Sequence, residues 1–226
     1  VCTNGVCTTR PAGLVLYWAF DESAGSSALD SSGNGLHGVY GGESGSPSPS
    51  PNVPTLMFAN PRSRSFAPDN RHYVQLANMS AALKPSNNFT ISVWFRTTGT
   101  VGATEIVTGG GAYALRIRST QVEFFKSTGG GGGIYCRGTV SNHLNGAWHH
   151  LAGVQTPSGM KVYFDGIERG ADNDGSNPVY DQRPDFQVAR HIEFVSWDFV
   201  GNADEVRVYQ RALSASEIAA LAQGRN

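Results

Sequence analysis

Residues 89–96 have the sequence Phe-Thr-Ile-Ser-Val-Trp-Phe-Arg, and this stretch decides the fold. Apolar residues occupy every odd position from Phe89 to Phe95, while the even positions hold Thr, Ser, Trp and Arg. Successive side chains of a β-strand point to opposite faces, so this period of two predicts a strand with one face in a core. A sandwich or barrel of such strands follows if the pattern recurs.

Short segments of the same kind recur along the chain. Residues 14–20 and 113–117 read as strands, residues 148–155 and 160–165 as a hairpin, and Val206 with Val208 as a last strand. The Gly-, Ser- and Pro-rich residues 41–54 are expected to form a loop within one domain, since neither side alone could close a sandwich.

One helix is expected, at the C-terminus. Ser214 and Glu217 are spaced as a capping box, Leu213 and Ile218 occupy the staple positions around it, and Gly224 is the expected stop. The sequence therefore predicts an all-β sandwich of two antiparallel sheets with a short C-terminal helix. We expect it to occupy residues 13–226, after a tail or linker at 1–12.

Composition limits the classes of partner. The chain has 226 residues, of which 28 are Gly and 15% are charged, and its formal net charge is −1. Such a charge, without a Lys/Arg cluster, gives no reason to expect nucleic acid as a partner. No apolar run approaches the roughly 20 residues of a membrane span, so none is expected.

The cysteines bear on the compartment. Cys2 and Cys7 flank a turn-prone Thr-Asn-Gly-Val, and a small disulfide there would suit an oxidising compartment; two free thiols on a frayed terminus are the alternative. Cys136 is expected to be a buried small hydrophobe. Asn78 and Asn88 begin Asn-x-Ser/Thr sequons, which matter only if the source glycosylates its proteins.

The order of the motifs resembles the LamG-like jelly-roll family of the concanavalin A-like superfamily. The match extends over about residues 13–222, and its six motifs are LVLYWAFDES (14–23), ALDSSGNGLHG (28–38), FTISVWFRT (89–97), GAWHHLAGV (146–154), MKVYFDG (160–166) and ADEVRVYQRALSASEIAAL (203–221). This resemblance implies two facing antiparallel sheets of six or seven strands each. It also implies a secreted or cell-surface module that binds carbohydrate or another extracellular partner, often with a structural calcium ion.

The calcium implied by the resemblance has candidate ligands. Asp30 and Asn34 offer hard oxygen ligands beside glycines that let carbonyls turn inward, and Asp204 matches the family's Asp-Glu-Val motif. The resemblance pairs Asp204 with Asp30; spacing alone does not. The alternative is that Asp30 and Asn34 form Asx turns only.

Catalysis finds little support. The Glu-x-Asp-x-x-Glu string of this superfamily's hydrolases does not occur, and adjacent acids such as Asp204 and Glu205 point to opposite faces of a strand. His149 and His150 likewise cannot readily chelate one ion. We expect them to pack structurally, with Trp148, His150, Ala152 and Val154 facing the core.

A binding surface is expected among the loops. Residues 190–199 depart most from the family pattern, and an exposed Trp197 beside Arg190, His191 and Asp198 would form a contact patch. The alternative is that Phe194, Trp197 and Phe199 cap the sandwich and stay buried. Trp18, Trp94 and Trp148 lie in strand patterns and are expected in the core.

Three functions remain in order of preference. The first is a non-catalytic carbohydrate-binding or adhesion module, secreted or at the cell surface and part of a larger protein or assembly. The second is a structural or protein-interaction module of such an assembly. The third is a hydrolase or lyase, which turnover of a polysaccharide would reveal.

Overall fold

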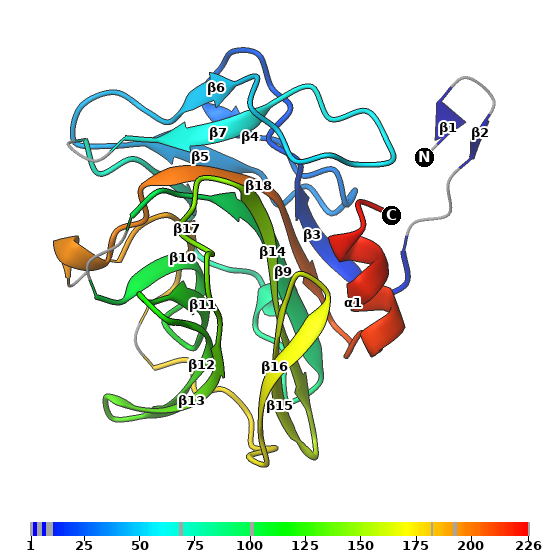
Figure 1. The fold of residues 1–226 in the computed structure, drawn as a ribbon, viewed down its shortest axis with the longest axis vertical. Helices are drawn as coiled ribbons and strands as arrows, with labels where there is room; N and C mark the ends of the chain where they lie inside the picture. Colours follow the sequence, from blue (N-terminus) through cyan, green and yellow to red (C-terminus); the bar gives the residue numbers. More distant parts are fainter. Residues whose placement is uncertain are drawn as a thin grey trace.

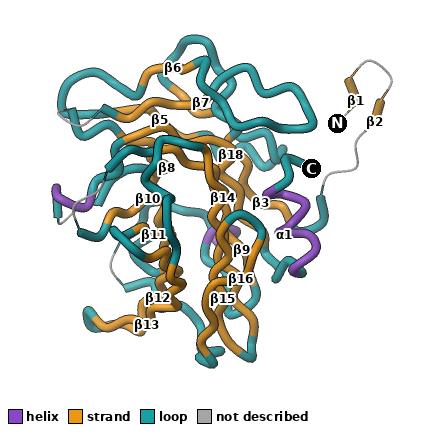
Figure 2. Tube along the Cα trace, viewed as in Figure 1, coloured by secondary structure: helices purple, strands orange, loops and turns teal. Residues whose placement is uncertain are grey.

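The strand predicted at residues 89–96 forms as β9 (Phe89–Arg96) at the centre of a sheet. Its odd-numbered side chains, from Phe89 to Phe95, are fully buried between two sheets. The two sheets are the layers visible in Figures 1 and 2. The all-β jelly-roll prediction is thereby confirmed in this computed structural model.

The structure describes residues 2–3, 6–7, 11–67, 70–99, 102–181, 183–191 and 194–225. Two eight-stranded antiparallel sheets form within these ranges, slightly larger than the six or seven strands expected. The first, called the β12 sheet, contains in spatial order β13 (Gly132–Thr139), β12 (Gln121–Gly129), β11 (Tyr113–Ile117), β10 (Thr104–Gly109), β17 (Phe186–Val188), β8 (Tyr73–Leu76), β5 (Gly38–Gly41) and β4 (Ser27–Ala28).

The second sheet, called the β9 sheet, faces it across the core. It contains in spatial order β16 (Ile167–Asp172), β15 (Gly159–Phe164), β14 (Trp148–Thr156), β9, β18 (Gly201–Tyr209), β7 (Ser63–Phe66) and β6 (Ser48–Ser50), with β3 (Leu14–Trp18) also paired to β18. The predicted hairpin is β14–β15, paired in register from Leu151 opposite Phe164 to Thr156 opposite Gly159.

The predicted helix is also present. α1 (Ala215–Ala222) begins at the N-cap Ser214, whose hydroxyl accepts from the Glu217 amide while the Glu217 carboxylate accepts from the Ser214 amide. Ile218 and Leu221 are buried in a second apolar cluster on the outer face of the β9 sheet. Two 3-10 turns, η1 (Ala81–Leu83) and η2 (Val195–Trp197), complete the helical elements described. None of the helices in the described ranges has the length and apolarity that crossing a membrane requires.

The outer face of the β9 sheet is covered in two places. α1 lies over Ala152 and Val154, and the segment 51–62 lies over the part nearer β18, where Asn60 bonds to Asp204. The segment also reaches the helix end, because the Met57 amide donates to the Gly224 carbonyl. In Figure 1 the cyan connection between β6 and β7 extends toward the C-terminus accordingly.

The arrangement of β14 under this cover shows that one prediction was wrong. Leu151 belongs to the core between the sheets, whereas Ala152 and Val154 belong to the cluster under α1, so His150 and Trp148 are on the outer face. Alternation misassigned the faces because both faces of β14 are apolar and buried. Of the three tryptophans expected in the core, only Trp18 is there; Trp94 and Trp148 are half-buried outside it.

The edges of the two sheets meet at β13 and β16. A Cβ at Gly138 would lie 2.3 Å from Arg169 Cβ, and one at Gly170 would lie 2.1 Å from the Arg137 carbonyl oxygen. This close approach protects two edge strands from pairing with other chains. The glycines are therefore packing requirements of the closed side of the sandwich.

The N-terminal segment forms a separate two-stranded pair, β1 (Cys2–Thr3) with β2 (Val6–Cys7). Cys2 is the register partner of Cys7, but their side chains lie outside the described residues and the disulfide stays a prediction. Cys136 is a buried free thiol, as expected, and burial raises its pKa to about 12. Asn78 and Asn88, which begin the two sequons, are both exposed.

We expect Gly170→Ala to lower the free energy of unfolding by about 1–3 kcal/mol, because the new methyl meets backbone that cannot move aside. Gly99→Ala is the matched control, since a Cβ there would have nothing within 4 Å. The control should change stability by less than about 1 kcal/mol. Urea unfolding of both variants checks this, and equal stabilities would contradict the close-approach argument.

Candidate functional site

The outer face of the β12 sheet carries a cross-strand row of alternating charges. Glu105 of β10 lies opposite Arg116 of β11, which lies opposite Glu123 of β12, which lies opposite Arg137 of β13. The inward neighbours of these residues are apolar core residues such as Leu115 and Phe124. Period-two geometry therefore forces the charged side chains outward together.

The charged side chains of the row form ion pairs with one another. Arg116 approaches Glu105 at 2.8 Å and Glu123 at 3.5 Å, and the Glu123 Oε2 accepts from Arg137 Nε at 2.8 Å and Arg118 Nε at 3.2 Å. Glu105 and Glu123 are almost completely buried, at 2% and 0% exposure. Buried carboxylates are tolerated only with such partners, so Arg116 holds two of them in place.

Aromatic rings continue from this row. The Arg116 guanidinium lies 4.0 Å from the Phe125 ring centroid and 5.2 Å from that of Trp197. Phe125 contacts Tyr135 at 5.1 Å between centroids, and Arg137 lies over Tyr135 at 4.7 Å. We call this continuous set the aromatic–arginine ladder; its members are Phe194, Trp197, Arg116, Phe125, Tyr135 and Arg137.

The loop end of the ladder is an aromatic cluster. Trp197 of η2 contacts Phe194 at 5.5 Å and His191 at 5.0 Å, and His191 stacks on Phe194 at 5.2 Å. Phe194 is 51% exposed and Val195 is 59% exposed, while Tyr135 at the other end of the ladder is 39% exposed. The ladder thus has a buried middle and two ends open to solvent.

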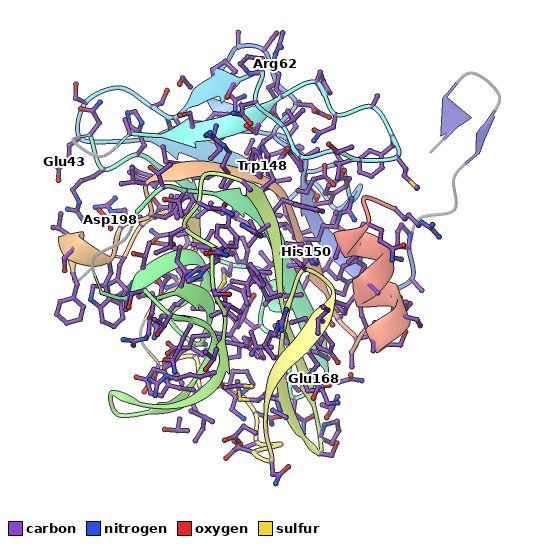
Figure 3. All side chains as sticks on the ribbon, viewed as in Figure 1. Glu43, Arg62, Trp148, His150, Glu168 and Asp198 are labelled. Carbon is purple, nitrogen blue, oxygen red and sulfur yellow. The ribbon has the colours of Figure 1, made fainter. Side chains whose placement is uncertain are left out.

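Asp198 fixes this loop on the sheet. Its Oδ1 accepts from the His191 amide at 2.8 Å, and its Oδ2 accepts from Arg71 Nε at 2.8 Å. Arg71 also pairs with Glu43 at 3.1 Å. Figure 3 shows Asp198 and Glu43 on the same side of the molecule. The backbone of Asp198 also forms an isolated parallel β-bridge with the backbone of Glu105 in β10.

Three of the four predicted contact residues therefore come together. His191, Trp197 and Asp198 share the loop end of the ladder, whereas the Arg190 guanidinium lies over the Tyr73 ring at 4.7 Å. Of the two alternatives for this loop, an exposed contact patch or aromatic residues that cap the sandwich, each describes a part: Trp197 is half-buried, whereas Phe199 is buried at 2% exposure. Sequence reasoning missed Arg116, Phe125 and Tyr135. The sequence held one signal that could have indicated them: Phe125 and Tyr135 occupy outward positions in strands whose other outward positions include charged residues.

The predicted calcium residues have different surroundings. Both Asp30 oxygens accept hydrogen bonds, Oδ1 from the Tyr17 and Ser32 amides and Oδ2 from the Ser32 hydroxyl and the Leu36 amide. Although burial opposes it, these bonds, led by those of Ser32, lower the pKa of Asp30. Asn34 donates its side-chain amide to the Val15 carbonyl. Donors occupy the Asp30 carboxylate, as in the Asx-turn alternative.

Asp204 lies elsewhere, beneath the segment 51–62. It is fully buried and accepts from Asn60 Nδ2 at 2.9 Å and from the Glu205 amide. Burial, then the nearby Glu205 and Asp21 carboxylates, raise the pKa of Asp204 well above its usual range. Within the described ranges no Lys or Arg pairs with Asp204, and no cluster of three His, Cys, Asp or Glu side chains is arranged to hold a metal.

The paired histidines are structural in their contacts. His149 Nδ1 lies 2.8 Å from Asp165 Oδ2, and its ring stacks on Phe164. His150 faces the other way, against Trp94, and burial together with Arg207 lowers its pKa to about 3. A histidine that stays neutral at physiological pH cannot serve as a general acid there.

The chain was compared with known proteins. A family model, Laminin_G_3, described as the concanavalin A-like lectin/glucanases superfamily, matches residues 68–219. None of the curated protein sequences matches the chain significantly. A similar solved structure is domain 4 of AbnA, a GH43 extracellular arabinanase from Geobacillus stearothermophilus, in complex with arabinotriose. Its TM-score is 0.69 at 19% identity, covering 94% of this chain and 99% of that one.

Two toxin structures are also similar. The binding domain of Paraclostridial mosquitocidal protein 1 has a TM-score of 0.69 at 15% identity, covering 93% of this chain and 52% of that one. A structure of botulinum neurotoxin type C, whose cell entry depends on two ganglioside molecules, has a TM-score of 0.64 at 13% identity, with coverages of 93% and 51%. The chain thus spans about half the length of these toxin chains. At such identities the likeness establishes the fold alone.

We expect Arg116→Ala to lower the free energy of unfolding by about 3–5 kcal/mol, because it leaves two buried carboxylates without their shared partner. Arg118→Ala is the control: its side chain is 30% exposed and Glu123 keeps two other arginines, so a loss below about 1 kcal/mol is expected. Chemical denaturation measures both. Similar losses for the two variants would show that Arg116 has no special role.

Proposed function

The chain belongs to the concanavalin A-like lectin/glucanase superfamily, and on this premise we propose that it is a non-catalytic glycan-binding module whose binding surface is the aromatic–arginine ladder. The ladder itself is the observation that carries the proposal. Sugars offer apolar ring faces and polar edges, which suit aromatic rings flanked by planar hydrogen-bonding groups. The similar structure of the arabinanase domain with arabinotriose supports a sugar as the ligand.

A lack of catalysis fits the same geometry. Glu105, Glu123 and Asp198 are the acidic residues beside the ladder, and each is paired with an arginine. Glycoside hydrolysis needs one carboxyl free to donate a proton and another free to attack or activate water. Turnover of any polysaccharide by the purified chain would overturn this part of the proposal.

We expect Trp197→Ala and Tyr135→Ala each to weaken glycan binding at least tenfold, because each removes a solvent-accessible ring at one end of the ladder. Trp148→Ala, a half-buried tryptophan on the opposite sheet, is the matched control and should bind as the unmodified chain does. A glycan array followed by titration calorimetry gives the affinities, and melting curves confirm that each variant folds. Unchanged binding by both ladder variants would refute the site.

A protein partner is the second candidate. The adjacent Phe194 and Val195 are both more than half exposed, and aromatic residues with arginine dominate protein-binding hot spots. A stable oligomer, or a captured extracellular protein, together with no glycan binding would favour this function over the first.

We further propose a structural calcium ion at Asp204 and, with it, an extracellular location. Asp204 is buried without a cationic partner, and Asn60 Oδ1 beside it is buried without a hydrogen bond from any described residue. Oxygen ligands of this kind suit calcium, and Asp21 would add a second carboxylate. Bound calcium would offset the charge of Asp204. Without the ion, the raised pKa of Asp204 stabilises the folded state at pH values below the ordinary pKa of Asp. This stabilisation is lost as the pH rises above that value.

We expect chelation to lower the melting temperature and calcium to restore it. At a calcium concentration a hundred times the dissociation constant, binding should raise the free energy of unfolding by about 2.7 kcal/mol. Asp204→Asn should abolish the response to calcium, whereas Asp30→Asn should keep it, since hydrogen-bond donors already occupy the Asp30 carboxylate. Scanning calorimetry of the three proteins distinguishes the sites. A response lost in Asp30→Asn would return the ion to residues 30–34, and an unmodified chain indifferent to calcium would end the proposal.

A further inference from the structure

The β13 end of the ladder carries more arginine than carboxylate. Glu123 alone is shared by Arg116, Arg118 and Arg137, and the only other carboxylate in the row, that of Glu105, belongs to Arg116. Three guanidinium groups therefore face two carboxylates. One positive charge at this end is left without a counter-charge in the described part of the chain.

The terminal nitrogens of Arg118 and Arg137 have no hydrogen-bond acceptor among the described residues. Each arginine uses Nε to bond to the same buried oxygen, Glu123 Oε2. Their side chains are nonetheless 30% and 42% exposed. Each side chain is thus partly exposed and keeps terminal N–H groups that a further acceptor could use.

A hollow lies beside these arginines. It has a volume of about 210 Å³ and is lined by Thr139, Val140, Ser141, Phe164 and Arg169. Thr139 is two residues beyond Arg137 on β13 and so shares its face, whereas Arg169 approaches the other face of β13 at Gly138, so the hollow lies at the edge where β13 meets β16. Arg169 is exposed and forms no ion pair with a described residue. The hollow is smaller than the 300–1,000 Å³ of typical ligand pockets, so it suits a substituent or one sugar residue.

We propose that the glycan bound by the ladder is acidic, and that Arg118 and Arg137 hold its carboxylate or sulfate group next to a sugar ring stacked on Tyr135. This inference rests on the proposed glycan-binding function and names its ligand class. Guanidinium groups bind oxyanions through paired, charge-assisted hydrogen bonds, which are about twice as strong as neutral ones. The hollow beside Arg169 receives the remainder of the charged residue.

The test uses the full chain on a glycan array that holds acidic glycans beside their neutral counterparts, including carboxyl-reduced and desulfated forms. We expect the bound members to be acidic and their neutral counterparts to bind at least tenfold more weakly. Binding should also weaken as the salt concentration rises, because the contact is between charges near the surface. Carboxylated and sulfated members on the same array tell which oxyanion is preferred.

The double variant Arg118→Gln/Arg137→Gln should lose at least tenfold in affinity for the acidic ligand and little for a neutral one. Lys84→Gln/Lys161→Gln is the control, because it removes the same charge from exposed side chains away from the ladder. Equal binding of neutral and acidic glycans, or no effect of the double variant, overturns the acidic class. If Trp197→Ala still abolishes binding in that case, the glycan-binding proposal survives; an array with no bound glycan overturns both.

Discussion

Face-to-face burial of the inner sides of two sheets is the constraint on which the structure depends. Every residue that β9 or β12 sends into the core obliges its neighbour to point outward. The inner set, exemplified by Val93 and Phe124, is apolar and fully buried. The outer positions of each sheet must therefore be covered, paired or left in water, and this chain treats its two outer faces differently.

The β9 sheet is covered by other parts of the chain, and the β12 sheet is not covered in the same way. α1 and residues 51–62 lie on the former. On the latter, Glu105, Arg116 and Glu123 neutralise one another across strands, and aromatic rings stack on the guanidinium groups. The binding surface that we propose is therefore supported by strands rather than by a loop alone. Trp197 comes from a loop, yet it rests on Arg116 of β11, and such support is what holds a binding ring in one orientation.

The sequence predicted the parts of this arrangement that are local. Alternation located β9, and the Ser214–Glu217 spacing located α1, because each depends on residues within one element. The loop with His191 and Trp197 was selected because it departs from the family pattern. The part of the ladder that lies on the sheet was not predicted. Arg116 lies opposite Glu123 only because of the register between β11 and β12, and this register cannot be read from a single sequence. The same limit explains His150: on a strand with two buried faces, alternation cannot say which face is inside.

Three acidic residues differ in how the chain itself stabilises them, and this difference guides the proposed position of the ion. Asp30 is satisfied by four donors from its own loop and neighbouring strand. Asp174 lies in an Asp-x-Asp-x-Ser stretch that has the composition of a calcium loop. The buried Lys126 Nζ nevertheless sits among its oxygens, 2.6 Å from Asp174 Oδ1 and 2.9 Å from the Ser176 carbonyl, and bonds from Lys126 and Ser176 lower the pKa of Asp174 to about 2. The Lys126 ammonium therefore contacts the oxygens that a metal ion would otherwise need in this loop. Asp204 accepts two hydrogen bonds, from Asn60 and Glu205, and has no cationic partner among the described residues, which is why we propose the calcium ion there rather than at Asp30 or Asp174.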